Sequence, residues 1–144
     1  MVIHGTFFAN ACLYSVIEEK MKNRVLVVDD NEFMLTMMSY ILDNEGYQVE
    51  TSTHAFGLMD HINVYQPNLI ILDVQLPDGD GRELCRQIKE TANMSEISVV
   101  MCSGLDEVQD CYNQQGPPDG ILHKPFDMRQ LLNLLSEKLP LLAA

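Results

Sequence analysis

The sequence predicts an α/β fold in which five parallel strands form a doubly wound sheet with helices on both faces. Three observations support this prediction. Five short strand-like runs alternate with segments of helical period, as in chains built from repeated strand and helix units. Runs such as residues 25–28 and 69–72 are continuously apolar, which is typical of strands covered on both faces. Polar residues follow directly where four of the runs end.

The strands are expected over residues 24–28, 47–51, 68–72, 97–102 and 120–123. The helices are expected over residues 31–45, 54–65, 82–91, 106–115 and 128–139. The first helix has an apolar stripe that should face inward, formed by Met34, Met37, Met38 and Ile41. Gly46 can take the left-handed conformation that ends this helix, and Pro67 follows the end of the second.

In the second half of the chain, residues 76–81 have turn chemistry and lead into the third helix. The fourth helix is expected to be short because its segment is polar and runs into residues 116–120, which contain Gly-Pro-Pro-Asp-Gly. The last helix should close one face of the sheet through its leucines, Leu131, Leu132, Leu134 and Leu135.

Four separated polar features lie where strands end. Asp29 and Asp30 follow the first strand, Asp73 the third, Ser103 the fourth and Lys124 the fifth. Because the carboxyl ends of parallel strands point the same way, these side chains should meet in one crevice. Three carboxylates, a hydroxyl and an ammonium group there would bind a divalent cation and a phosphoryl group.

These residues resemble the receiver domain of two-component response regulators, over roughly residues 22–139. The resemblance rests on the order and spacing of four motifs: the acidic pair, Leu72-Asp-Val-Gln-Leu-Pro-Asp-Gly-Asp-Gly81, Ser103-Gly104 and Lys124-Pro-Phe126. It implies a flavodoxin-like sheet in which the first, third, fourth and fifth strands surround the binding crevice. The end of the second strand has no charged residue, which agrees with a position beside the site.

The resemblance implies that Asp73 is the phosphoacceptor and that Mg²⁺ is the cofactor. A bound Mg²⁺ would neutralise charge on the carboxylate and on the incoming phosphoryl group. Asp30 would bind the ion directly, Asp29 largely through water, and the backbone carbonyl of Gln75 would complete the set with Asp73. Taken alone, the acidic pair would be better explained as a helix cap.

The resemblance gives Lys124 and Ser103 roles beside Asp73. Lys124 would pair with Asp73 before phosphorylation and with a phosphoryl oxygen afterwards, and its bond to Pro125 would be cis. The Ser103 hydroxyl would move toward the new phosphoryl oxygen and so carry the signal, with an ordinary serine in a turn as the alternative. One departure from the family is Ile121, which stands where receivers usually have an aromatic residue. The neighbouring His123 is expected to be an exposed bystander.

Composition narrows the remaining function classes. The 144 residues are 47% hydrophobic and 21% charged, which suits one globular domain. The net charge of -12, with only nine lysines and arginines, argues against direct binding of nucleic acid. The four cysteines lie far apart without metal-ligand spacing, so they are expected to be reduced thiols of a cytoplasmic protein that does not enter a membrane.

Residues 1–21 are treated as an extension and residues 22–144 as the receiver domain. The apolar stretch over residues 7–17 is too short to span a bilayer and has no basic leader, so a secretion signal is not expected. Two explanations stay open. The stretch could form a short helix for docking or dimerisation, or the natural start could be Met21, directly before the first strand.

The expected function is that of a single-domain response regulator, a signalling domain with slow self-dephosphorylation rather than an enzyme. It would receive its phosphoryl group from a sensor histidine kinase or phosphotransfer protein. Because the chain ends shortly after the last helix, output is expected through a downstream effector protein or a homodimer. One alternative is a Mg²⁺-dependent phosphohydrolase with an aspartyl-phosphate intermediate, although Gln75 replaces its usual second Asp. Another is a degenerate receiver that acts as a docking module.

Overall fold

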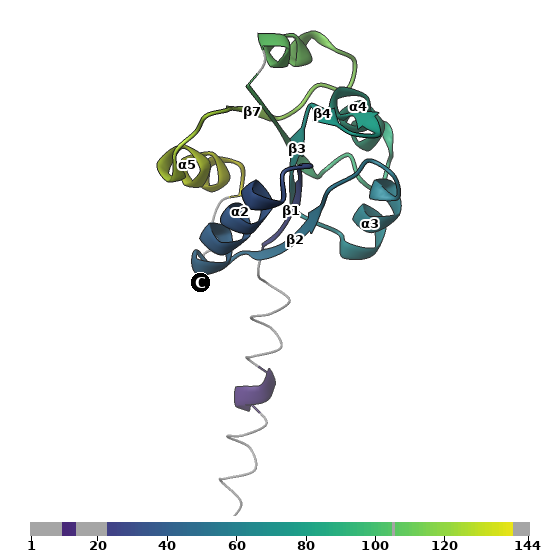
Figure 1. The fold of residues 1–144 in the computed structure, drawn as a ribbon. Coiled ribbons are helices and arrows are strands. Elements are labelled where there is room, and N and C mark those ends of the chain that lie inside the picture. The colour runs from purple at the N-terminus through teal and green to yellow at the C-terminus, as the bar shows by residue number, and fades with distance from the viewer. Residues whose placement is uncertain (1–9, 14–22, 105, 140–144) are drawn as a thin grey trace, which may run out of the picture.

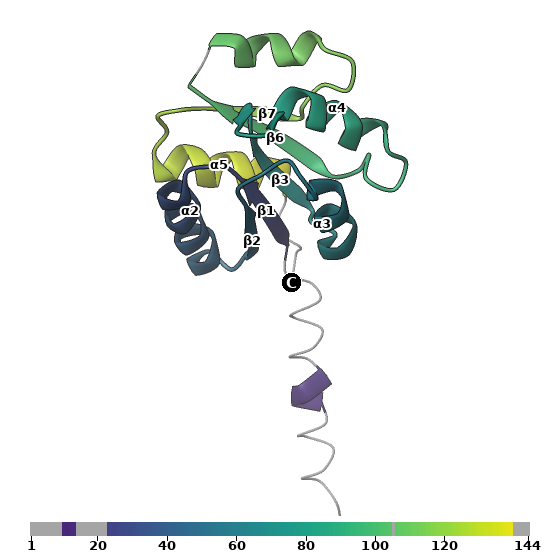
Figure 2. The ribbon, with the colours of Figure 1, turned by 45° about the vertical axis from the view of Figure 1, so that its right-hand side comes forward.

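A five-stranded parallel sheet forms the centre of the molecule in a computed structural model that describes residues 10–13, 23–104 and 106–139. Its strand order is β2-β1-β3-β6-β7 (Figure 1, with β6 labelled in Figure 2). The strands are β1 (Arg24–Val28), β2 (Gln48–Ser52), β3 (Leu69–Asp73), β6 (Ser98–Ser103) and β7 (Gly120–His123). The predicted doubly wound parallel sheet is therefore confirmed.

Helical segments cover both faces of this sheet. They are α2 (Glu32–Asn44), α3 (Leu58–Tyr65), α4 (Gly81–Glu90), the 3-10 helix η1 (Asp106–Asn113) and α5 (Met128–Lys138). Figure 2 shows α2 and α5 together on one side and α3 and α4 on the other. Each strand is thus linked to the next through a helical crossover, as the alternating sequence pattern predicts.

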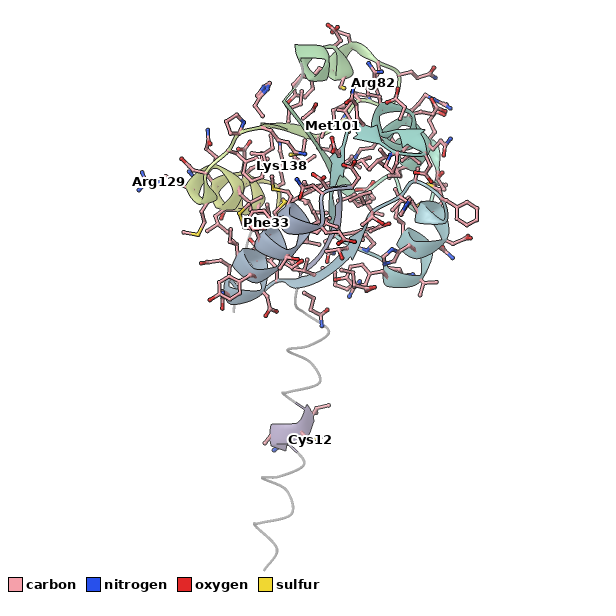
Figure 3. The ribbon with its side chains drawn as sticks, in the orientation of Figure 1. Cys12, Phe33, Arg82, Met101, Arg129 and Lys138 are labelled. Carbon is pink, nitrogen blue, oxygen red and sulfur yellow. The ribbon has the colours of Figure 1, made fainter. Side chains whose placement is uncertain are left out.

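Two apolar cores lie between the sheet and these helices. On one face, Leu26 and Ile70 of the sheet pack against α3 and α4 through residues such as Ile62 and Ile88. On the other face, Val27 and Ile71 pack against α2 and α5 in the same way. Alternate residues of each central strand therefore serve opposite cores, which explains why these strands are apolar throughout. Met101 of β6 lies within this interior and is 0% exposed (Figure 3).

Three details differ from the sequence-based predictions. The buried side of α2 is formed by Leu35, Met38 and Leu42, whereas Met34, Met37 and Ile41 are only half-buried. Met38 is buried, and Met34 and Ile41 pack against the same core, so the expected inward stripe is present in part but misses Leu35 and Leu42. The second helix begins at Leu58 instead of residue 54, because Gly57 adopts a left-handed conformation with φ of 75°. The segment after β6 is a short helix, as expected, but it is a 3-10 helix that ends at Asn113, two residues before the expected end.

A small antiparallel hairpin follows β3 and brings the chain back toward it. The hairpin pairs β4 (Gln75–Leu76) with β5 (Gly79–Asp80), and Leu76 is buried in the core. α4 then starts at Gly81, whose N–H donates to the carbonyl of Val74 at 2.8 Å. A Cβ at residue 81 would overlap the carbonyl oxygen of Asp73, so only glycine allows this close return.

Most of the expected N-terminal extension lies outside the described residues. The exception is residues 10–13, which are helical and exposed. The two explanations offered for residues 1–21 therefore stay predictions. Among the described residues, no helix is both long and apolar enough to cross a bilayer.

Candidate functional site

The predicted site residues meet at the carboxyl edge of the sheet. They surround an open depression of about 540 Å³, whose lining includes Asp30, Asp73, Gln75, Ser103 and Lys124. The strand order explains this meeting, because β1, β3, β6 and β7 are consecutive neighbours and all point the same way. β2 lies outside β1 and contributes no lining residue.

Two acidic residues leave β1 with different exposure. Asp29 is 3% exposed, and its Oδ1 accepts the N–H of Asn31 at 2.9 Å. Asp30 is exposed to solvent in the depression. The side chain that caps α2 is that of Asn31, which accepts the N–H of Met34 at 3.1 Å. The acidic pair therefore does not cap α2, and both carboxylates are available to the site.

Asp73 ends β3 as a buried carboxylate with only 7% exposure. Its Oδ1 accepts the backbone N–H of Gln75 at 3.3 Å. Burial raises the pKa of Asp73 above its ordinary value, and the charge of Asp29 raises it further, against the opposing effect of Lys124. The ionised form of Asp73 is therefore destabilised in this crevice and gains from any cation placed beside it.

Lys124 supplies such a cation from the end of β7. Its Nζ donates to Asp29 Oδ2 at 2.7 Å and to Asp73 Oδ2 at 3.4 Å. Burial by itself lowers the pKa of Lys124, but the hydrogen bond to Asp29 and the charges of both carboxylates raise it on balance. The expected pairing with Asp73 is present, although the shorter contact is to Asp29. The bond to Pro125 is cis, as the resemblance implies.

Ser103 lies beside the lysine on the adjacent strand. The residue is 4% exposed, and its backbone carbonyl accepts the N–H of Lys124 at 3.0 Å. The register of β6 and β7 places Ser103 opposite His123, which is itself exposed. Ile121 is half-buried and packs against the core on the side of α3 and α4. The residue at the usual aromatic position is thus part of the apolar interior.

The carboxylates fit a divalent cation that prefers oxygen ligands. Asp29, Asp30 and Asp73 each offer an oxygen, and these oxygens all lie within 4.8 Å of one another. Mg²⁺ suits such a set, since it binds a few carboxylates and keeps some of its water. In the part of the chain that the structure describes, no other group of at least three His, Cys, Asp or Glu residues is arranged this way.

One residue near the site was missed by the sequence reasoning. Asp78 lies at the tip of the hairpin, and its carboxylate accepts the backbone N–H groups of Ala55 and Phe56. In the sequence, Asp78-Gly79 signals only a turn. A hydrogen bond across more than twenty residues leaves no local pattern that could have indicated this contact.

Comparisons with known proteins agree with this geometry. The family model described as the response regulator receiver domain matches residues 25–136. The alkaline phosphatase synthesis transcriptional regulatory protein PhoP of Bacillus subtilis is 33% identical over 112 residues, which are 77% of this chain and 46% of that protein. The DNA-binding dual master transcriptional regulator RpaA of a Synechocystis strain is 30% identical over 110 residues, 76% of this chain and 46% of that protein.

The chain therefore spans about half the length of the curated relatives it matches. Among solved structures, the chemotaxis response regulator CheY4 of Vibrio cholerae superimposes with a TM-score of 0.75 at 25% identity. That match covers 82% of this chain and 99% of the other.

Proposed function

The chain belongs to the response regulator receiver domain family, and from this premise we propose that it accepts a phosphoryl group on Asp73. The donor would be a sensor histidine kinase or a phosphotransfer protein. One observation supports the proposal above all: a buried Asp73 carboxylate lies within 3.4 Å of the Lys124 ammonium and beside two further carboxylates. Receiver domains are signalling domains, so the phosphorylated aspartate itself would carry the signal, and no small-molecule product would be needed.

The transfer forms one bond and breaks another. An oxygen of the ionised Asp73 attacks phosphorus, the bond between phosphorus and the donor nitrogen breaks, and its electron pair stays on the donor imidazole. Lys124 favours the ionised form of Asp73 that this attack requires, against the opposing effect of burial. In the product, Lys124 lies within reach of a phosphoryl oxygen and can offset part of its charge.

We propose Mg²⁺ as the cofactor, held by Asp29, Asp30, Asp73 and the backbone carbonyl of Gln75. When bound, the ion neutralises charge on the carboxylate and the phosphoryl group and helps to align them. The protein contributes a preformed cluster of oxygens whose repulsion Lys124 only partly offsets. Asp30, as the exposed member, is the natural point of first contact for a hydrated ion.

Output would follow from Ser103 and its surroundings. We propose that the Ser103 hydroxyl approaches the new phosphoryl oxygen and shifts the segment that follows β6. Ile121 has no ring or hydroxyl, so the accompanying change at β7 would be a repacking of an aliphatic side chain. The modified surface would then bind an effector protein or a second copy of the chain, and slow self-dephosphorylation would end the signal.

Direct contact with nucleic acid is not part of this proposal. RpaA is named a DNA-binding regulator, but the match covers less than half of that protein. The 144 residues of this chain carry a net charge of -12, which opposes binding to a phosphate backbone. We propose the receiver role for residues 22–144, and we propose that the protein is cytoplasmic.

The test is phosphorylation by a small donor. The protein is incubated with Mg²⁺ and acetyl phosphate, and intact mass spectrometry compares wild type with Asp73→Asn and with Asp60→Asn, a matched change at an exposed residue of α3. Labile phosphorylation that needs Mg²⁺ and Asp73 but not Asp60 supports the proposal. Steady hydrolysis of added phosphoesters would indicate the phosphohydrolase instead. No modification of Asp73, even with a histidine kinase as donor, would indicate the docking module.

A further inference from the structure

The hairpin after β3 connects two parts of the site. It begins at Gln75, whose backbone carbonyl is proposed as a metal ligand, and it returns at Asp80 to the start of α4. Its inner end is fixed because Leu76 is buried in the core. Its tip, at residues 77 and 78, is exposed and needs some other contact to fix its direction.

Asp78 provides that contact. One carboxylate oxygen accepts the N–H of Ala55 at 2.7 Å, and the other accepts the N–H of Phe56 at 2.9 Å. Both donors belong to the loop between β2 and α3, so the tip of the hairpin is joined to a different strand connection. The hydrogen bonds from Ala55 and Phe56 also hold the pKa of Asp78 below its ordinary value. The carboxylate is thus ionised at neutral pH, which strengthens both hydrogen bonds.

The two loops also touch at short range. A Cβ at Gly79 would lie 2.8 Å from the Cβ of Ala55, so the backbones approach more closely there than side chains would permit. In the loop over residues 53–57, Ala55 packs against the core, but the rest of the loop is less firmly held. Phe56 is 91% exposed, and Gly57, the residue before α3, gives the helix no side-chain cap. The Asp78 carboxylate is therefore a main polar attachment of this loop.

The same loop is attached to the acidic pair at its other end. The backbone N–H of Asp29 donates to the carbonyl of Ser52 at 3.1 Å, and the Ser52 hydroxyl donates to the carbonyl of His54 at 3.2 Å. The contacts run from Asp29 through Ser52 and Ala55 to Asp78 and then along the hairpin to Gln75. This circuit joins the carboxylates after β1 to the carbonyl after β3 through the end of the β1–β2 pairing, the loop after β2 and the hairpin.

We propose that Asp78 is a positioning residue that holds the Gln75 carbonyl at the correct distance from Asp29 and Asp30 for metal binding. The proposal rests on the function proposed above. Asp78 does not touch the ion or the phosphoryl group; it acts through the loop and the hairpin. Removing a residue that supports a metal ligand commonly changes metal affinity by about 10- to 100-fold. Because Asp78 acts on Gln75 only through the hairpin, the change in metal affinity should be near the lower end of this range, about tenfold.

Three variants test the proposal in the full chain. Asp78→Ala removes both acceptors, Asp78→Asn keeps one, and Asp60→Asn makes the same charge change on α3. Mg²⁺ affinity is measured by calorimetry on the unphosphorylated protein. Acetyl phosphate labelling is measured as a function of Mg²⁺ concentration. Amide hydrogen exchange at Ala55 and Phe56 reports the loop itself, and circular dichroism reports folding.

We expect Asp78→Ala to lower Mg²⁺ affinity by about tenfold, Asp78→Asn to show a smaller loss, and Asp60→Asn to match wild type. Labelling at saturating Mg²⁺ should return to the wild-type rate, and the Ala55 and Phe56 amides should lose protection. Unchanged Mg²⁺ affinity in a folded Asp78→Ala protein would overturn the proposal, as would unchanged amide protection. If wild type itself neither binds Mg²⁺ nor accepts phosphate, the proposed function fails first, and the two failures are therefore distinguishable.

Discussion

Gly81 offers the sharpest test of how the fold holds Asp73 in place. Replacing Gly81 with Ala puts a Cβ onto the carbonyl oxygen of Asp73, 2.9 Å from its carbonyl carbon and 3.0 Å from the Cα of Val74. All of these are backbone atoms, which cannot rotate away as a flexible side chain could. Relief requires α4 and the end of β3 to move apart.

Two effects compete in the Gly81→Ala variant. Alanine in place of glycine within a helix stabilises the folded protein by about 1 kcal/mol, because it lowers the conformational entropy of the unfolded chain. Forcing an extra carbon into a packed interior costs about 1–3 kcal/mol, and the overlap with backbone places this case at about 3 kcal/mol. The net expectation is a loss of about 2 kcal/mol, so the steric effect wins.

The assay is urea unfolding followed by circular dichroism. With a slope of about 2 kcal/mol per molar urea, a loss of about 2 kcal/mol lowers the midpoint by about 1 M. Gly104→Ala is the control, because its Cβ would meet nothing closer than 3.5 Å and should leave the midpoint nearly unchanged. Phosphorylation of Gly81→Ala should also slow, since Asp73 moves. A midpoint equal to or above that of wild type would show that the start of α4 accepts a Cβ at residue 81 without moving away from β3.

Three further predictions concern single side chains. Asp73→Asn should melt at a higher temperature than wild type at pH 7 in EDTA, because burial raises the pKa of Asp73 and its ionised form is unfavourable in the folded protein. The difference in melting temperature should vanish as the pH falls below the ordinary carboxyl range. A wild type that stays equally stable at both pH values would contradict this prediction. Burial raises the pKa of Cys85 and of Cys102 to about 12, so these thiols should not react with iodoacetamide at neutral pH in the folded protein. Intact mass should show modification of the exposed Cys12 alone in the folded protein and of all four cysteines in urea. Rapid labelling of Cys102 in the folded protein would be inconsistent with the fold. Asp80→Ala should lower the free energy of unfolding by about 1 kcal/mol, as measured by thermal unfolding, because Asp80 caps α4 and pairs with Arg82. The difference from wild type should shrink at low pH, where the wild-type carboxylate becomes protonated.

The sequence was sufficient to predict the sheet and the meeting of the site residues. Each relevant strand is a continuous apolar run, and the residue that ends it is polar, so the end of β3 at Asp73 could be located closely. The topology of parallel sheets then determines that the ends of β1, β3, β6 and β7 gather at one edge. No long-range contact had to be known for this step.

Features set by packing could not be predicted in the same way. α2 has two overlapping apolar stripes, one through Met34 and Met37 and another through Leu35 and Leu42. Periodicity cannot choose between stripes that differ by one residue, because the rotation of the helix is set by its contact with β1 and β2. The start of α3 was misplaced for a similar reason, since the preceding loop is held by Asp78 from a distant turn.

The sequence also could not predict which carboxylate lies closer to the Lys124 ammonium group. Spacing identifies a lysine and carboxylates at one edge, but it does not rank Asp29 against Asp73 as the closer partner. That ranking depends on differences of less than 1 Å between side-chain positions, here 2.7 Å against 3.4 Å.

The convergence of distant segments at one edge of the sheet has a consequence for protein synthesis. The acidic pair is translated early, whereas Lys124 follows β7 and is translated only when all five strands of the sheet have been made. A ribosome-bound fragment that stops before β7 therefore contains Asp73, the proposed phosphoacceptor, but not the Lys124 ammonium group that lies 3.4 Å from it. If the proposed function is correct, phosphoryl transfer to Asp73 requires the complete sheet, and an unfinished copy of the chain does not accept the phosphoryl group.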